Sequence, residues 1–179
     1  MGTIRQVKEK YERAFNALPD TIANVVQQTS DVLIDLNRDQ LLQGRDADGE
    51  LLKPTYTEDP YFSTEAATRM WPRLTPRERA DKYYKMKKDW EATHKARMTY
   101  VELYGQKPDN VPNLLITGNW FFNFFFVNVT KEAYTLGSTG YVADDIKQKY
   151  PRVFGIAPKS AEFYYFSFIR PAIERLYKQ

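Results

Sequence analysis

Two consecutive stretches of helical periodicity at the start of the sequence constrain the fold most strongly. From Ile4 to Leu18, apolar residues recur every three or four positions, as on one face of an amphipathic helix. Pro19 is expected to end this helix, and Asp20 to cap a second helix that ends at Gly44. The apolar positions of the second helix are Ile22, Val25, Val26, Thr29, Val32, Leu33, Leu36 and Leu41. These positions form the strongest helical period in the chain.

Residues 44–74 show no regular period. Asp48-Gly49 indicates a turn, and Pro54, Pro60 and Pro72 preclude a long regular element. A connection of about 30 residues is rare inside a compact domain unless it is functional or is ordered by a partner. Its aromatic residues, of types that interfaces favour, are Tyr56, Tyr61, Phe62 and Trp71. We therefore predict an extended binding arm within the domain.

A third, basic helix is predicted from Thr75 to Tyr104. Thr75, Pro76 and Glu78 have the order of a capping box. The basic side chains of this helix could follow a phosphate backbone, with aromatic residues beside them for stacking. The candidate nucleic-acid contacts are Lys85, Lys87 and Lys88. A solvated helical face with internal charge pairs is favoured instead, because the formal net charge is only +3.

The C-terminal part combines strands and helices. The aromatic run Trp120–Val129 is apolar on both pleated faces, which predicts a central strand buried from both sides. A turn at 130–132 then leads into a second strand, Ala133–Gly137. A short helix is expected within 140–150, and Ser160 is expected to cap a last helix that Pro171 kinks or divides.

These elements predict one α+β domain over residues 1–179, with four main helices on a small antiparallel sheet. Aromatic residues make up 15% of the chain, more than a small monomer readily buries. Packing between subunits is the simplest explanation of this excess. The predicted subunit-interface residues are Tyr56, Tyr61, Phe62, Trp71, Tyr164 and Phe168.

Several classes of chemistry are excluded by composition. The chain has no cysteine, which removes disulfides, thiolate metal sites and cysteine nucleophiles. Its single histidine, His94, has no Ser or Asp partner at a helical spacing, so a hydrolase using it is the weakest alternative. The segment Asp46–Glu50 is similar to part of a calcium loop but lacks the remaining ligands, and a solvated turn is favoured. We expect no enzyme activity, no cofactor and no metal.

Membrane attachment is not expected either. No apolar run approaches the roughly 18 residues that a membrane span requires. The N-terminal residues have no apolar core of the kind that signal peptides carry.

The order of short motifs resembles a known protein family. These motifs are Leu36-Asn37-Arg38-Asp39-Gln40-Leu41-Leu42 with Gly44, Asp48-Gly49, Pro112-Asn113-Leu114, Thr117-Gly118-Asn119 with Phe121, and Tyr150 with Val153-Phe154-Gly155-Ile156. In this order the sequence resembles the small head–tail joining and tail-completion proteins of tailed bacteriophages. The motifs span most of the chain, although each is short.

The resemblance implies a virion structural protein, assembled in the host cytoplasm, without catalytic residues. Such proteins form homo-oligomeric rings at the portal–tail junction, contact neck, portal or tail proteins, and let DNA pass without sequence-specific binding. The long segment 54–74 and the phenylalanine-rich strand depart from the family pattern. We expect a ring-forming connector or tail-completion subunit that buries its arm in a neighbour's groove. The alternative is a nucleic-acid-binding accessory protein using helix 76–104.

Overall fold

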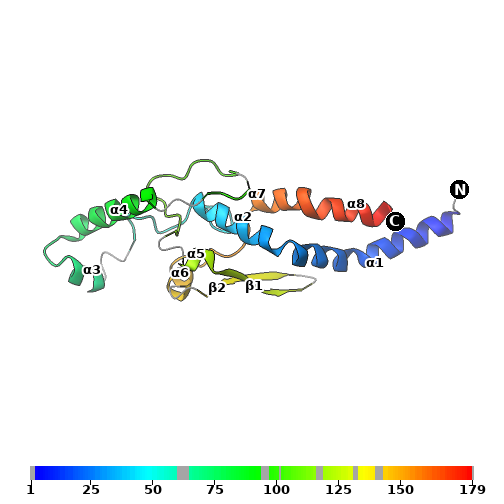
Figure 1. The fold of residues 1–179 in the computed structure, drawn as a ribbon, viewed down its shortest axis with the longest axis horizontal. Helices are drawn as coiled ribbons and strands as arrows, with labels where there is room; N and C mark the ends of the chain where they lie inside the picture. The colour runs from blue at the N-terminus through cyan, green and yellow to red at the C-terminus, as the bar shows by residue number, and fades with distance from the viewer. Residues whose placement is uncertain are drawn as a thin grey trace.

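The chain forms an elongated molecule in which the first and last helices lie side by side (Figure 1). This computed structural model describes residues 3–59, 65–93, 97–100, 102–115, 119–130, 133–139 and 143–178. Both chain ends lie toward one end of the molecule, and helices α3 and α4 lie at the other (Figure 1). The predicted α+β class is confirmed, although the helical part is more finely divided than the four main helices expected.

Helix α1 (Ile4–Gln28) begins with a capping box in which the Thr3 amide donates to Gln6 Oε1 at 2.8 Å. Pro19 lies inside this helix, so the predictions that it ends the helix and that Asp20 caps another are wrong. Because Pro19 is exposed, solvent can hydrate the carbonyl group that loses its helical donor. The break comes at Thr29, whose hydroxyl donates to the Val25 carbonyl at 2.7 Å.

Helix α2 (Ser30–Leu42) ends at the predicted glycine. Gly44 has a φ of 68°, a left-handed conformation that side chains disfavour. A Cβ at this position would lie 2.6 Å from Val111 Cγ1, so the close approach of the 111–115 segment also requires glycine.

Helix α3 (Glu65–Met70) precedes helix α4 (Pro76–Thr93). The predicted capping box is confirmed: the Thr75 amide donates to Glu78 Oε2 at 2.8 Å. The helix ends at Thr93, however, and not at Tyr104. Beyond it, the amides of Thr99 and Tyr104 donate to the side chains of α2, which leaves them unavailable for helical hydrogen bonds.

The predicted hairpin is confirmed as β1 (Phe124–Val129) and β2 (Tyr134–Ser138), which pair antiparallel. Two details differ from the prediction. Trp120 lies in a short helix, α5 (Asn119–Phe122), which precedes the strand. The strand is also neither central nor buried on both sides, because over the described residues the sheet consists of β1 and β2 and Val127 is 58% exposed.

The C-terminal segment contains α6 (Ala143–Lys149), α7 (Pro158–Tyr164), a π-helical turn η2 (Tyr165–Ile169) and α8 (Arg170–Lys178). The Arg170 amide donates to the carbonyl of Tyr165, five residues earlier. Proline in an α-helix collides with the carbonyl group four residues before it. The widened turn precedes Pro171 and relieves this collision, so the predicted division of the helix takes the form of a π-helical turn.

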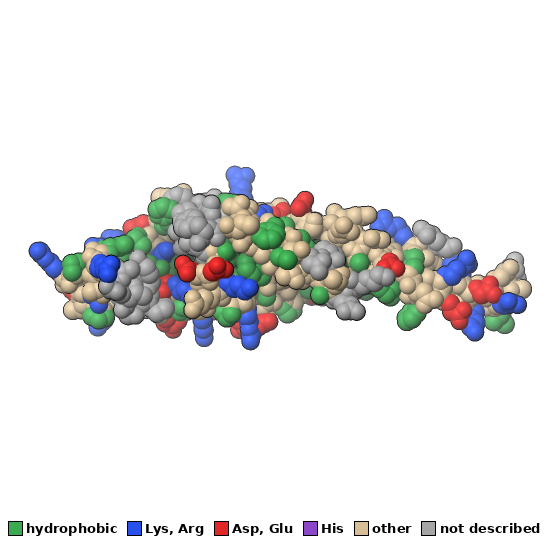
Figure 2. Space-filling view, turned by 90° about the horizontal axis from the view of Figure 1, so that it is seen from below, with side chains coloured by type: hydrophobic (Ala, Val, Ile, Leu, Met, Phe, Trp, Pro, Cys, Tyr) green, Lys and Arg blue, Asp and Glu red, His purple; other side chains and the backbone are tan. Residues whose placement is uncertain are grey.

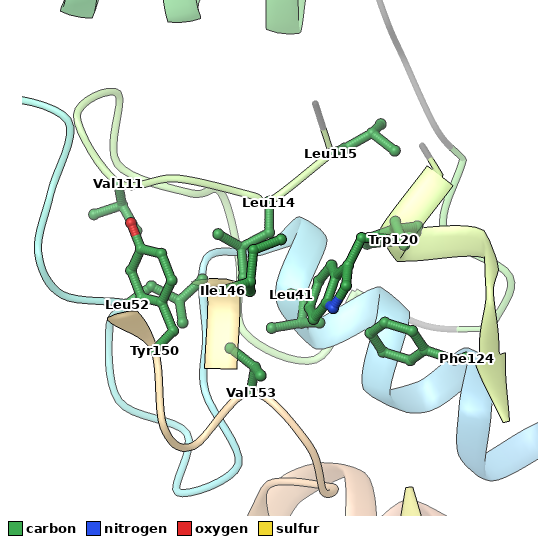
Figure 3. Packing of buried hydrophobic residues seen from close by; sticks show 11 residues of the cluster. Leu41, Leu52, Val111, Leu114, Leu115, Trp120, Phe124, Ile146, Tyr150 and Val153 are labelled. Atoms are coloured by element: carbon green, nitrogen blue, oxygen red, sulfur yellow. The ribbon is translucent and has the colours of Figure 1, made fainter. Parts of the chain in front are cut away.

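The core consists of two clusters of buried side chains, and α2 contributes to both. The first joins α2 to the 111–115 segment, α5, β1 and α6 around Leu41 and Trp120 (Figure 3). The second places Leu33 and Leu36 of α2 against Tyr164 and Ile169. Helix α2 is therefore the element around which the other layers pack.

The same helix also buries polar side chains that bind distant backbone. Asn37 Nδ2 donates to the carbonyls of Val153 and Gly155 at 2.9 and 2.8 Å. Gln40 Nε2 donates to the Gly155 carbonyl at 2.7 Å, and Gln40 Oε1 accepts from the Ala157 amide at 2.8 Å. These contacts fix the 153–157 segment on α2.

A second pair of side chains holds the segment that follows α4. Asp39 Oδ1 accepts the Thr99 amide at 2.8 Å, and Asp39 Oδ2 accepts the Tyr100 amide at 2.8 Å. Gln43 Oε1 accepts the Tyr104 amide at 2.7 Å. Burial raises the pKa of Asp39, and the two amides oppose that shift. We call Asn37, Asp39, Gln40 and Gln43 the α2 polar face.

Replacement of Gln40 by Ala should lower the free energy of unfolding by about 2–4 kcal/mol. The variant leaves the buried Ala157 amide without its acceptor and removes one donor each from the carbonyls of Asp46 and Gly155. Urea denaturation followed by circular dichroism measures the change. Gln28→Ala, at an exposed position of α1, is the control. Equal stability of the two variants would contradict the role given to the α2 polar face.

Candidate functional site: interaction surfaces

The first half of the predicted arm is folded onto the domain. Tyr56 is only 5% exposed, its amide donates to the Asn110 carbonyl at 2.8 Å, and its hydroxyl donates to Glu91 Oε1 at 2.6 Å. Burial and the hydrogen bond to Glu91 raise the pKa of Tyr56. This predicted interface residue therefore packs inside its own subunit, and residues 45–59 do not form a free arm.

The other predicted interface residues are distributed over three regions. Tyr164 is buried, and its hydroxyl lies 2.6 Å from that of Thr29. Phe168 is half-buried and stacks on Tyr164 with ring centroids 5.3 Å apart. Trp71 is half-exposed, with Lys82 Nζ 5.4 Å from its ring centroid. Tyr61 and Phe62 lie outside the described residues, as do His94, Thr117 and Gly118.

A buried polar network attaches α4 to the rest of the molecule. The Tyr83 hydroxyl donates to Asp59 Oδ2 at 2.9 Å, and Lys149 forms an ion pair with the same buried carboxylate. Glu91, which accepts from Tyr56, also pairs with Lys107 at 3.3 Å. The basic helix is thus held against the 54–59 segment, α6 and the 107–115 segment.

The three candidate nucleic-acid lysines do not share one open surface. Lys88 is half-buried and pairs with Asp109 at 2.8 Å. The Lys87 amine lies 5.0 Å from the centroid of the Tyr83 ring. Burial, together with the nearby Lys149, lowers the pKa of Lys87. Lys85 is exposed.

Sequence reasoning missed an exposed apolar surface on the first half of α1. Ile4, Val7, Tyr11 and Phe15 form the apolar face of the predicted amphipathic helix, and they are 91%, 48%, 56% and 67% exposed. We call these four residues the N-terminal stripe. The tapered end of the molecule formed by this helix carries hydrophobic side chains next to charges of both signs (Figure 2). The periodicity correctly predicts the helix and its apolar face, but it does not show which element, if any, packs against that face.

Helix α8 covers a different side of α1. Ala14 is buried, Lys10 Nζ donates to the Lys178 carbonyl at 3.3 Å, and the rings of Tyr11 and Tyr177 lie 5.8 Å apart. Small alanine residues of α1 thus face α8, while most of the larger apolar side chains remain outside this contact.

A second exposed apolar surface lies on the hairpin. It consists of Phe125 and Val127, which share one pleated face of β1 and are 39% and 58% exposed, and we call it the sheet patch. A Cβ at Gly137 would lie 3.2 Å from Phe125 Cζ and 3.3 Å from Val127 Cγ2. The two side chains therefore extend across β2 at a position where that strand has no side chain.

The described residues show no arrangement typical of a metal site. In this part of the chain, no three His, Cys, Asp or Glu side chains are grouped so that they could hold a metal ion. Asp46 Oδ1 accepts the amides of Asp48 and Glu50, both at 3.0 Å, and Asp48 pairs with Arg152. The calcium-like segment thus forms a turn held by its own carboxylate. None of the helices over the described ranges combines the length and apolar character needed to cross a bilayer.

Comparison with known proteins gives no relative. The chain matches no protein-family model, no curated protein and no solved structure.

Lys87→Met should increase stability at pH 7, and the gain should shrink toward pH 10. Because the pKa of Lys87 is lowered below the ordinary 10.5, the folded state binds this proton less readily than the unfolded chain. The ammonium therefore destabilises the fold below its lowered pKa, and less so as pH rises. Urea denaturation at both pH values measures the difference, with the exposed Lys85→Met as control. Lower stability of Lys87→Met than of the wild type at pH 7 would be the opposite result.

Proposed function

We propose that this protein is a structural subunit of a tailed-bacteriophage particle, a ring-forming head–tail connector or tail-completion protein. The observation that carries the assembly role is the exposed apolar surface of the N-terminal stripe and the sheet patch. Monomeric soluble proteins rarely expose large contiguous apolar patches, and those that exist often mark contacts with other proteins. Burial of such side chains contributes roughly 25 cal/mol for each Å² of apolar surface.

The assignment to phage particles rests on the sequence resemblance. Contacts between the residues that carry this resemblance support it further. The landmarks Asn37 and Gln40 bind the carbonyl of Gly155, which belongs to the last landmark of the chain. Gly44 ends the helix that carries the first of these landmarks. Motifs that are short and far apart in the sequence therefore meet in one hydrogen-bonded region.

In the proposed ring, the sheet patch of one subunit lies against a different surface of its neighbour. Such a heterologous contact closes into a ring when its rotation permits. Tyr56 packs within its own subunit, so in the described part of the arm a contact with the neighbour would use residues 65–74, among them the half-exposed Trp71. DNA would pass through the channel without base-specific contacts, and neck, portal or tail proteins would bind above and below the ring.

The alternative, a nucleic-acid-binding accessory protein, loses support from the intramolecular contacts of Lys87 and Lys88. It predicts DNA affinity that falls steeply with salt and is lost when the three lysines are neutralised.

Light scattering at low and high salt, with electron microscopy of large species, tests the proposal. We expect a salt-resistant multimer that appears as rings. Val127→Asp should break the multimer into smaller species, because the carboxylate would be desolvated in the contact. Asn24→Asp adds the same charge at an exposed polar position of α1 and should leave the multimer intact. A monomer that binds DNA at low salt would contradict the proposal and favour the alternative.

A further inference from the structure

We propose that the N-terminal stripe pairs with the same stripe of a second copy of this chain, with the two α1 helices antiparallel and crossing at the level of Lys10. This contact is isologous and lies apart from the sheet patch. It requires no phage function and does not depend on the proposed ring.

The geometry of the stripe fits a helix–helix contact. Ile4, Val7, Tyr11 and Phe15 are spaced three or four residues apart, so they lie on one face of α1. The row continues through Leu18 and Ile22, and Ile22 packs against the second core cluster. One apolar row is thus covered within the subunit at its C-terminal end and exposed at its N-terminal end.

The charges beside the stripe identify a second copy as the partner. Lys8 and Glu12 border the stripe on the side away from Lys10 and Ala14, which contact α8 and the chain end. Their side chains are exposed, and Lys8 Nζ lies 3.6 Å from Glu12 Oε1 within the helix.

An antiparallel crossing at the level of Lys10 brings these charges together across the pair. Lys8 lies two residues before the crossing point, and Glu12 of the other copy lies two residues beyond it in the opposite direction. The two positions therefore lie at the same height along the helix axis, whereas the two Lys8 positions, like the two Glu12 positions, are about 6 Å apart at 1.5 Å per residue. The two-fold symmetry produces this attraction twice. The same crossing places Ile4 beside Phe15 and Val7 beside Tyr11.

A parallel pair fits the same surface poorly. Two-fold symmetry along parallel helices would turn the Lys8 side of one copy toward the Ala14 side of the other. Ala14 is buried where α8 lies against α1, so that side is already covered within the subunit. The antiparallel arrangement leaves both copies of α8 in place.

Charge exchange tests the pairing in the full chain carrying Val127→Asp, which separates it from the proposed sheet contact. Lys8→Glu and Glu12→Lys should each raise the dimer dissociation constant about tenfold, because each places like charges opposite one another twice. An equimolar mixture of the two variants should restore the wild-type value, since every facing pair is then opposite in sign. Sedimentation equilibrium measures all four samples.

A stripe variant provides the second arm of the test. Phe15→Glu should abolish dimerisation, and Asn16→Glu, the next residue on the polar side of the helix, should not. Circular dichroism of both variants checks that each has the helical content of the parent. A monomeric Val127→Asp parent, or a mixture that associates no better than its components, would overturn the pairing. Rings formed by the wild-type protein would survive either result, so failure of the pairing is distinguishable from failure of the proposed function.

Discussion

Hydrogen bonds from the α2 polar face to distant backbone are the interaction on which the rest of the structure depends. Backbone groups in irregular segments need partners, and those of Thr99, Tyr104 and the 153–157 segment obtain them from four side chains between Asn37 and Gln43. Two-thirds of the hydrogen bonds in ordinary domains are between backbone groups. Here side chains form hydrogen bonds with the backbone in segments that belong to no helix or strand. The two apolar clusters pack against the segments that these hydrogen bonds hold on α2.

Signals that act over a few residues predicted the structure well. The capping box at Thr75, the end of α2 at Gly44, the hairpin and the disruption before Pro171 follow from local chemistry, and all are present. Each depends on atoms within about five residues, as turn and cap interactions do. Other local signals failed: Ser160, predicted to cap the last helix, lies inside α7, which begins at Pro158 after Ala157, and Asp20 lies inside α1.

Boundaries set by distant groups were not predictable in this way. Nothing near Thr93 in the sequence shows that Asp39 and Gln43 accept the amides of the following segment. Pro19 remains inside α1 because its position is exposed, which periodicity alone does not reveal. The exposure of the N-terminal stripe has the same origin: an apolar row predicts that something covers it, without saying whether the cover belongs to the same chain.

Besides the rings of Trp120, Phe121 and Phe124 in the first core cluster, two further groups of aromatic residues have different roles. Tyr56, Tyr83 and Tyr164 combine a buried ring with a hydroxyl that contacts Glu91, Asp59 and Thr29. They join elements within the subunit, because each ring is buried on one element while its hydroxyl reaches a polar side chain on another. Phe15, Phe122 and Phe125 have no polar atom in the side chain and remain exposed. The high aromatic content therefore combines core packing, tyrosine hydroxyl contacts within the subunit and exposed phenylalanine rings.

The separation in sequence between Gln40 and its partner at Ala157, 117 residues, has a consequence for how the chain folds. Contacts between such distant positions raise the contact order, and folding slows because long loops must close before these contacts form. During synthesis, α2 emerges long before the 153–157 segment, so its polar side chains stay solvated until that segment leaves the ribosome. The two core clusters share α2 and close over it only afterwards. Completion of the tertiary structure is thus delayed until late in translation, and the N-terminal helices wait for the C-terminal part of their own chain.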